Sequence, residues 1–224
     1  MSKKPFIQFE SITKQYLDKK PILSNAGFNI DSGEFLFLTG ISGAGKSTVF
    51  KMLMGLEKPD QGTVFVNQTD VTKLNPKALT HHLRQVGMVF QDYKLLYNKS
   101  VHYNIRLPLQ ITGASHHATE KKIRNTAVEL GLEGLLKQKV ESLSGGEQQL
   151  VAIARASIHS PPLILADEPT ANLDHKMARR IFEVLKQIKD QGKTVIIATH
   201  DIQLIKSYEA RTLLIKNAEI IEVR

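Results

Sequence analysis

Residues 35–48 read Phe35-Leu36-Phe37-Leu38-Thr39-Gly40-Ile41-Ser42-Gly43-Ala44-Gly45-Lys46-Ser47-Thr48. The first five residues are strand-like, and the loop that follows has the G-x-x-x-x-G-K-S pattern and leads into a helix. In this setting the glycines let backbone N–H groups wrap around phosphate groups, and the helix N-terminus adds positive potential. Lys46 can neutralise the β and γ oxygens, and Ser47 can ligate Mg²⁺. The stretch predicts a nucleotide site with contacts from Ser42, Gly43, Ala44, Gly45, Lys46, Ser47 and Thr48.

Two carboxylates follow a second apolar segment. Residues 163–166 are apolar and strand-sized, and Asp167 and Glu168 come directly after them. Open α/β sheets bind ligands at the carboxyl ends of their strands. Asp167 is suited to hold Mg²⁺, and Glu168 can accept a proton from, or orient, the water that attacks a γ-phosphate. A phosphate loop alone could belong to a kinase, a GTPase or an ATPase, and this carboxylate pair narrows that choice.

A serine and a glutamate, Ser144 and Glu147, have the spacing of a helix capping box. A capping box alone marks only the start of a helix. However, Gly145 and Gly146 lie in the first turn, where glycine weakens a helix unless the backbone must approach something closely. We therefore expect the N–H groups and the dipole of this helix to face a phosphate.

The order of apolar segments predicts an α/β fold. Three strand-sized segments are each followed by a helix-like one: 35–39 before 46–54, 163–167 before 176–191, and 195–199 before 201–208. Such pairs indicate a parallel sheet covered by helices on both faces. Segments 7–12, 27–30 and 63–67 resemble short antiparallel strands, and 212–216 with 219–223 resemble a hairpin. We interpret the chain as one domain, 1–224, in which a mainly helical subdomain, 93–157, is inserted in a core of 1–92 and 158–224.

Composition and charge set limits on the class of protein. No apolar stretch approaches the roughly 20 residues needed to span a bilayer, and the first ten residues hold no apolar segment of signal-peptide length. There is no cysteine, which excludes disulfides and thiolate metal sites and agrees with a reducing compartment. We expect a cytoplasmic protein. The formal charge of +8 would suit an anionic partner, but the basic residues are scattered, so a solvated basic surface explains it equally well.

Taken together, the motifs resemble the ATP-binding cassette (ABC) ATPases over essentially the whole chain. The resemblance implies a P-loop NTPase (RecA-like) core with an antiparallel β-subdomain and an inserted helical subdomain. In that family the segment Leu-Ser-Gly-Gly-Glu, here the signature segment (residues 143–147), contacts the γ-phosphate bound to the opposite subunit. Ser144, Gly145 and Gly146 would thus act across a homodimer that encloses two ATP molecules.

The same resemblance implies roles for further residues. Gln91 would contact Mg²⁺ together with Ser47 and Asp167, Tyr16 would stack on adenine, and residues 171–174 would form a loop at the dimer contact. The residues expected to act in catalysis are Glu168, His200 and Lys46, with His200 on the γ-phosphate. Two positions depart from the family pattern, Leu150 where arginine is usual and Ala171 where glycine is usual. Neither replaces an expected catalytic residue, so we expect hydrolysis to be retained. We expect it to be slow, as in an enzyme whose output depends on a partner.

Four stretches, 38–45, 89–96, 107–115 and 198–205, are similar to a subgroup of ABC ATPases that acts in bacterial cell division. In this subgroup an integral membrane partner passes ATP-driven motion to cell-wall hydrolases, which implies a peripheral position on the inner face of the bacterial inner membrane. Relatives in lipoprotein release and macrolide efflux share most of these motifs and stay an alternative. A soluble ABC ATPase of DNA repair or translation is a second alternative. Such proteins generally carry tandem cassettes, coiled coils or zinc modules, whereas this chain has one cassette, no heptad run and no cysteine. No nucleic-acid partner is therefore expected.

The membrane partner is expected to dock between the core and the helical subdomain, near residues 93–105. The apolar and aromatic side chains expected to line this groove are Tyr93, Leu95, Leu96, Tyr97, Val101, Tyr103 and Ile105. Aromatic and aliphatic side chains of this kind can form the walls of a helix-binding groove. They can equally be ordinary core residues of the inserted helices.

Overall fold

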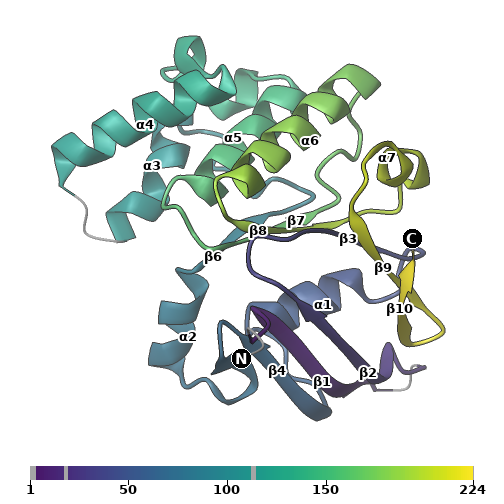
Figure 1. Ribbon diagram of the computed structural model, residues 1–224. Helices are drawn as coiled ribbons and strands as arrows, with labels where there is room; N and C mark the ends of the chain where they lie inside the picture. Colours follow the sequence, from purple (N-terminus) through teal and green to yellow (C-terminus); the bar gives the residue numbers. More distant parts are fainter. Residues whose placement is uncertain (1–3, 18–19, 112–114, 224) are drawn as a thin grey trace.

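The computed structural model describes residues 4–17, 20–111 and 115–223, and these form two sheets surrounded by helices (Figure 1). Residues 112–114, inside the stretch 107–115 that carries part of the resemblance, lie outside the described residues. No helix in the described ranges has the length and apolar character needed to cross a bilayer.

The larger sheet has six strands in the order β10-β9-β3-β8-β7-β6, and all neighbours are parallel except β10. Its strands are β3 (Phe35–Thr39), β6 (Val86–Val89), β7 (Leu163–Asp167), β8 (Thr194–Ala198), β9 (Arg211–Lys216) and β10 (Glu219–Val223). The predicted parallel sheet and terminal hairpin are confirmed. Since neighbouring parallel strands end at one edge, the loops after β3, β7 and β8 come together there.

The smaller sheet is antiparallel, in the order β2-β1-β4-β5. It consists of β1 (Ile7–Lys14), β2 (Leu23–Ile30), β4 (Gln61–Val66) and β5 (Thr69–Asp70). The predicted strands 7–12, 27–30 and 63–67 fall on β1, β2 and β4. Figure 1 shows α1 lying between this sheet and the larger one.

The helices are α1 (Lys46–Leu53), α2 (Pro76–Leu83), α3 (Val101–Ile111), α4 (His116–Leu130), α5 (Gly145–Ser157), α6 (His175–Asp190) and α7 (Ile202–Ser207). Short 3-10 turns lie at Val71–Lys73, Glu133–Leu135 and Val140–Ser142. The apolar face of α4 is buried through Ile123, Ala127 and Leu130, and Gly131 ends the helix with φ of 69°. Helices α3, α4 and α5 all fall within 93–157, and the boundaries of that subdomain stay a prediction.

The larger sheet separates two apolar cores. Phe37, Ile164 and Ile197 face the core shared with α3, α4, α5 and α6, whereas Leu36, Leu165 and Ile196 face the core around α1 and the smaller sheet. This alternation follows from the period of two along a strand. A strand covered on both faces must be apolar at successive positions, which explains the continuous apolar runs of the sequence.

The structure corrects part of the expected docking groove. Leu95, Val101 and Ile105 are no more than 5% exposed and belong to the core of the helical side. They cannot be the walls of a surface groove, and that expectation was wrong for these three side chains. Leu150, which replaces the arginine usual in the family, is also buried in this core at 1% exposure. Its role is therefore apolar packing within α5.

Candidate active site

The phosphate loop connects β3 to α1, as the sequence predicts. Lys46 is buried, and its Nζ donates to the backbone oxygen of Gly40 at 2.9 Å, so the lysine lies folded back across the loop. Gly45 precedes α1 with φ of 110°, and a Cβ at this position would collide with the side chain of Ile22. Only glycine fits both this backbone conformation and this space. The loop is thus shaped by its own residues and by packing against Ile22.

Ser47 and Asp167 supply neighbouring oxygen atoms from two elements. The hydroxyl of Ser47, in the first turn of α1, donates to Oδ2 of Asp167 at the end of β7, at 2.9 Å. Burial raises the pKa of Asp167, the charge of Glu168 adds to the rise, and the Ser47 hydrogen bond and Lys46 oppose it. A hydroxyl and a carboxylate at this spacing are the hard oxygen ligands that Mg²⁺ prefers. The pair therefore fits a magnesium ion, which would also favour the ionised carboxylate.

Glu168 lies between a histidine and the loop lysine. Its Oε1 is 2.7 Å from Nδ1 of His200 and 3.7 Å from Nζ of Lys46. The Glu168 side chain is 12% exposed and that of His200 is 70% exposed, so the carboxylate is sheltered and the imidazole faces solvent. The backbone of Glu168 has φ of 46°, and its N–H donates to the oxygen of Ala198 on β8. The ends of β3, β7 and β8 thus converge on one polar cluster.

Tyr16 lies at a cavity beside the phosphate loop. The cavity has a volume of about 660 Å³, and its lining includes Ile22, Ile41, Gly43, Ala44 and the hairpin residues 214–218. It combines an aromatic ring, aliphatic side chains and the outer part of the loop. Such a cavity suits a planar base whose phosphates extend into the loop.

The signature segment has the predicted capping box. The hydroxyl of Ser144 accepts from the N–H of Glu147, and the Glu147 carboxylate accepts from the N–H of Ser144 at 2.8 Å. Ser144 and Gly145 are exposed, whereas Gly146 packs so closely on Met177 that a Cβ would require that side chain to move. The start of α5 is therefore ordered and partly open to solvent.

Several predicted site residues lie apart from the polar cluster. Among the described residues, no hydrogen bond or ion pair joins Lys46, Asp167, Glu168 or His200 to Tyr16, Gln91, Ser144, Gly145 or Gly146. Gln91 is exposed and lies two residues beyond the end of β6. One chain thus brings together the loop, the carboxylates and His200, while the signature segment is presented elsewhere.

Sequence reasoning missed the residues that support the site from a distance. Arg155 on α5 donates to the backbone oxygens of Tyr93 at 2.7 Å and Lys94 at 2.6 Å, and both of these residues have positive φ. It thereby fixes the segment that follows Gln91. The partners are separated by about sixty positions, and no local pattern signals such a contact. Glu57 contacts Tyr16 from 41 positions further along the chain and was missed for the same reason. Lys14 lies only two positions before Tyr16, but a single lysine gives no signal of a contact with the ring.

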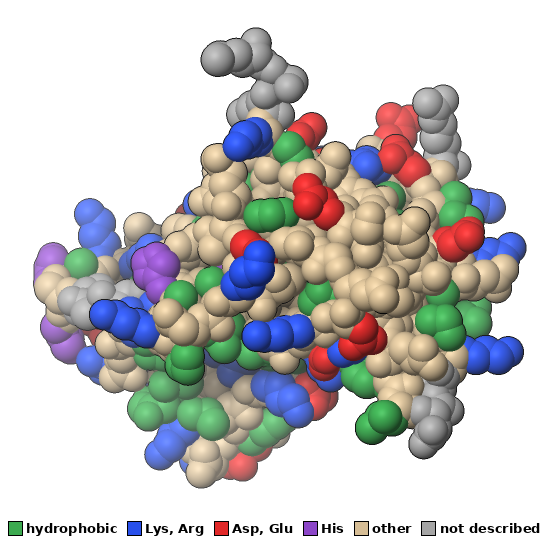
Figure 2. All heavy atoms as spheres, turned by 90° about the horizontal axis from the view of Figure 1, so that it is seen from below, with side chains coloured by type: hydrophobic (Ala, Val, Ile, Leu, Met, Phe, Trp, Pro, Cys, Tyr) green, Lys and Arg blue, Asp and Glu red, His purple; other side chains and the backbone are tan. Residues whose placement is uncertain are grey.

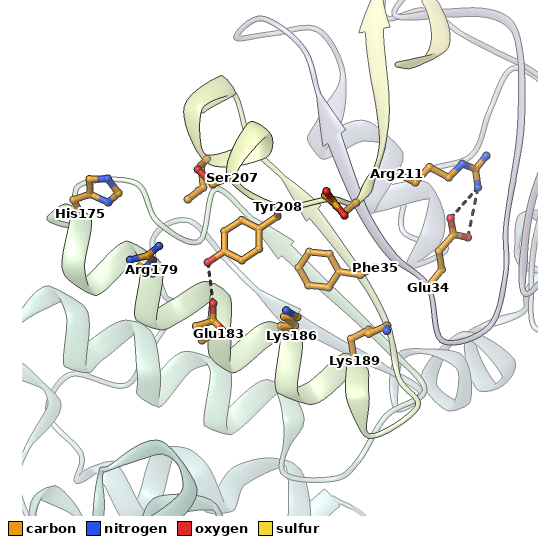
Figure 3. A pocket seen from close by; sticks show the side chains of 13 residues that line it. Glu34, Phe35, His175, Arg179, Glu183, Lys186, Lys189, Ser207, Tyr208 and Arg211 are labelled. Atoms are coloured by element: carbon orange, nitrogen blue, oxygen red, sulfur yellow. Dashed lines mark hydrogen bonds and ion pairs between the residues drawn. The ribbon is translucent and has the colours of Figure 1, made fainter. Parts of the chain in front are cut away.

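A further cavity, of about 730 Å³, lies between α6, α7 and the first residues of β3 and β9 (Figure 3). Tyr208 donates to Glu183 at 3.3 Å, and Arg211 pairs with Glu34 at 3.1 Å, so these acidic groups already have partners. None of the lining residues belongs to the phosphate loop or to the polar cluster. The sequence motifs, and not cavity size, therefore select the cavity beside Tyr16 as the candidate nucleotide site.

Comparisons with known proteins agree with this arrangement. The family model described as ABC transporter matches residues 23–171. The cell division ATP-binding protein FtsE of Escherichia coli K12 is 41% identical over 209 residues, which cover 92% of this chain and 94% of that protein. The ABC transporter ATP-binding protein YxdL of Bacillus subtilis is 39% identical, with 88% of this chain and 77% of that protein covered.

A solved structure, the dimeric post-hydrolysis state of the ATP-binding cassette MJ0796 bound to ADP and Pi, superposes with a TM-score of 0.87. The two chains are 35% identical, and the match covers 97% of this chain and 98% of the other. The family match spans more than half of the chain, and the fold and the phosphate loop of the chain agree with that match. This chain therefore belongs to the family of ABC transporter ATPases.

Proposed function

We propose that this ABC ATPase is an FtsE-like subunit that converts ATP binding and hydrolysis into a signal during bacterial cell division. The observation that carries the proposal is the polar cluster at the ends of β3, β7 and β8, in which Glu168 contacts both Lys46 and His200. The likeness to FtsE over nearly the whole chain supports the cellular role.

The arrangement gives each residue a role in the hydrolysis of ATP. Lys46 exchanges its bond with the Gly40 oxygen for the β and γ oxygens when the nucleotide enters the loop. A water oxygen attacks the γ-phosphorus, the bond to the β-phosphate oxygen breaks, and Glu168 accepts the proton of the water. His200 orients the Glu168 carboxylate through a hydrogen bond, and its exposed ring can contact the γ-phosphate. Ser47 and Asp167 would hold Mg²⁺, which neutralises charge on the phosphates.

We propose a homodimer as the active form. The signature segment begins α5 with exposed Ser144 and Gly145, yet within the described residues it makes no hydrogen bond or ion pair with the polar cluster of its own chain. A second copy can bring this helix N-terminus to the γ-phosphate and so complete the site. The dimeric MJ0796 structure supports such an assembly.

An FtsX-like membrane subunit would dock along α3. Near its start, Tyr97 is 43% and Tyr103 is 38% exposed, although both are large and largely apolar. Towards its end, an apolar hollow of about 260 Å³ lies between α2 and α3 and is lined by Thr80, Leu83, Arg84, Pro108, Ile111 and His159. Exposed aromatic side chains beside a hollow suit an amphipathic helix of the membrane subunit. The proposed surface keeps Tyr97 and Tyr103 from the expected region 93–105, omits the three buried side chains, and extends to the hollow beyond that region.

A nucleic-acid partner has less support. Figure 2 shows Lys and Arg side chains interspersed with Asp and Glu over the face seen from below, without a continuous basic stripe. Nucleic-acid sites gather basic residues on one face or along one helix. The charge of +8 is thus dispersed on this face rather than focused.

The second candidate function is that of the ATPase of an exporter, in lipoprotein release or macrolide efflux. The observation in its favour is the 39% identity to a protein described only as an ABC transporter ATP-binding protein. Deletion of the gene separates the two, because a division role predicts filamentous cells with a septation defect. Normal septation together with loss of lipoprotein release or drug resistance would favour the exporter.

The proposal is tested by isolating the complex from its native membrane. We expect wild-type protein to co-purify with an integral membrane subunit of the FtsX type, and Tyr97→Glu to reduce that recovery at least about tenfold through burial of a charge in the contact. Val128→Glu, at a 58% exposed apolar position on α4, is the matched control and should leave recovery unchanged. Full recovery with Tyr97→Glu would place the docking surface elsewhere, and absence of any membrane subunit would contradict the proposed role.

A further inference from the structure

Tyr16 is held by two charged side chains that lie outside the recognised motifs. Its hydroxyl donates to Oε2 of Glu57 at 3.3 Å, and Nζ of Lys14 lies 5.2 Å from the centroid of its ring. Lys14 and Glu57 also pair with each other, with 2.6 Å between Nζ and Oε1. One carboxylate therefore connects the hydroxyl of Tyr16 with the ammonium group above its ring.

Lys14 is fixed more firmly than a surface lysine. Its side chain is 9% exposed, and Nζ donates to the backbone oxygen of Lys58 at 2.8 Å and approaches Asp60 at 3.5 Å. Burial by itself would lower the pKa of Lys14, but Glu57 and Asp60 raise it above its ordinary value. The other oxygen of Asp60 accepts the N–H of Gln15 at 2.7 Å, which ties down the backbone next to Tyr16. The group remains charged and has little freedom to move.

Glu57 is attached to the helix that carries the phosphate loop. The N–H groups of Leu56 and Glu57 both donate to the backbone oxygen of Lys51, at 2.9 and 3.2 Å, in the last turn of α1. Lys46 opens the same helix. Helix α1 thus presents the phosphate loop at its N-terminus and, beyond its C-terminus, fixes the position of Tyr16 through Glu57.

The ring of Tyr16 lies at the cavity, and the two charged side chains that hold it do not. Tyr16 lines the cavity beside the phosphate loop, whereas Lys14 and Glu57 are not among the lining residues. Since Lys14 covers one face of the ring, a planar ligand must stack on the other face. Lys14 and Glu57 therefore act on the ligand through Tyr16 and not by contact.

We infer that Lys14 and Glu57 are positioning residues that orient Tyr16 for the base of the nucleotide and so set the affinity for the base without affecting that for the phosphates. The inference rests on the proposed function, because it takes ATP as the ligand. It adds a connection between the two halves of the nucleotide site, running along α1 from the loop to the aromatic ring.

The test compares ATP with inorganic tripolyphosphate, which has the phosphates but no base. Glu57→Gln should raise the dissociation constant of ATP about fivefold, by loss of a charge-assisted hydrogen bond, and that of tripolyphosphate less than about twofold. Glu34→Gln, which breaks the ion pair with Arg211 instead, is the matched control and should change neither constant. Lys14→Met should likewise raise the dissociation constant of ATP more than that of tripolyphosphate. The melting transition of this variant checks that it is folded.

Repeating the comparison in a protein that lacks the Tyr16 ring makes the test specific for this residue. In a Tyr16→Ala protein, adding Glu57→Gln should cause no further loss of ATP affinity, because the ring that Glu57 orients is gone. Equal changes for both ligands, no change for ATP, or a loss that persists in the Tyr16→Ala background would overturn the inference. If wild-type protein binds neither ligand, the proposed function is overturned, and this inference with it.

Discussion

At the scale of single residues, Glu168 occupies a backbone conformation that residues with a Cβ rarely adopt. Its φ of 46° lies in the left-handed region, which costs of order 1 kcal/mol for a side chain of this kind. The N–H bond to Ala198 and the contacts with His200 and Lys46 hold it there. The strain is consistent with a carboxylate whose position matters for chemistry, since it directs Oε1 between the lysine and the histidine.

His200 is predicted to affect the rate of hydrolysis and not the binding of ATP. His200→Ala removes the group 2.7 Å from Glu168, and we expect kcat to fall at least about tenfold, because the carboxylate loses its orientation. The affinity for ATP should stay within about threefold, since the phosphate loop is intact. His175→Ala, at an exposed histidine at the start of α6, is the control and should keep normal turnover. A His200→Ala protein that hydrolyses ATP at the normal rate would contradict the assigned role.

A buried histidine predicts a dependence of stability on pH. His82 on α2 is 5% exposed, its Nε2 bonds to the backbone oxygen of Leu53 at 2.7 Å, and burial lowers its pKa below the ordinary value of 6.5. The unfolded chain therefore binds a proton near pH 6.5 while the folded chain resists it. Stability is present above pH 6.5 and is lost as the pH falls towards the lowered pKa.

Melting temperatures at pH 7.5 and pH 5.5 test whether stability falls with pH as predicted. Wild-type protein should melt at a lower temperature at the acid pH, and His82→Gln should reduce the difference. Burial also lowers the pKa of His159, so part of the difference should remain. His117→Gln, at an exposed position on α4, should behave like wild type. An unchanged difference in His82→Gln would show that this histidine is not the source.

At the scale of elements, Arg155 joins α5 to the segment that carries Gln91. Arg155 uses two separate nitrogens of its planar guanidinium for the oxygens of Tyr93 and Lys94, and the single nitrogen of a lysine cannot reproduce that geometry. Arg155→Lys should lower stability by about 1–2 kcal/mol and reduce kcat several-fold, because the segment with Gln91 loosens. Denaturant unfolding and steady-state kinetics check both effects.

Arg211→Lys is the matched control for this change. Arg211 donates to the backbone oxygen of Asn29 at 2.8 Å and pairs with Glu34, at the end of β9 remote from the polar cluster. The Arg211→Lys protein should lose stability while keeping its normal rate of ATP hydrolysis. If the two variants lose activity in proportion to their stability, Arg155 has only a structural role.

The elements that sequence reasoning predicted are those with local signals. β3, β7 and β8 are short apolar runs, and their order with the following helices was enough to expect a parallel sheet. Because parallel strands end at a common edge, Lys46, Asp167, Glu168 and His200 could be expected to lie together. Helix α2 was not predicted, although Asn75 caps it and Pro76 follows at its first position.

What could not be predicted depends on contacts between distant parts of the chain. Leu95 has the same apolar character as a groove residue, and only the packing of α3 and α5 around it decides that it is buried. Lys14 and Glu57 are ordinary charged residues in the sequence, and Glu57 reaches both Lys14 and Tyr16 because the chain after α1 meets the end of β1 in the fold. No spacing rule links positions brought together in this way.

At the scale of the whole molecule, the larger sheet lies between two apolar cores, and the candidate nucleotide site lies at the edge where its strands β3, β7 and β8 end (Figure 1). The loop and the carboxylates belong to one copy, and the signature segment is proposed to complete the site of another. Catalysis should therefore depend on assembly, and the isolated chain should turn over slowly.

Phosphate release by wild type and by Glu168→Gln tests whether Glu168 activates water at an ATP site. Both proteins are purified with the membrane subunit, given Mg²⁺ and ATP, and shown to bind ATP equally. We predict slow but measurable release by wild type and a rate at least about 100-fold lower for Glu168→Gln, as for loss of a general base. Release by wild type no faster than by Glu168→Gln, with ATP bound to both, would show that Glu168 does not activate the attacking water.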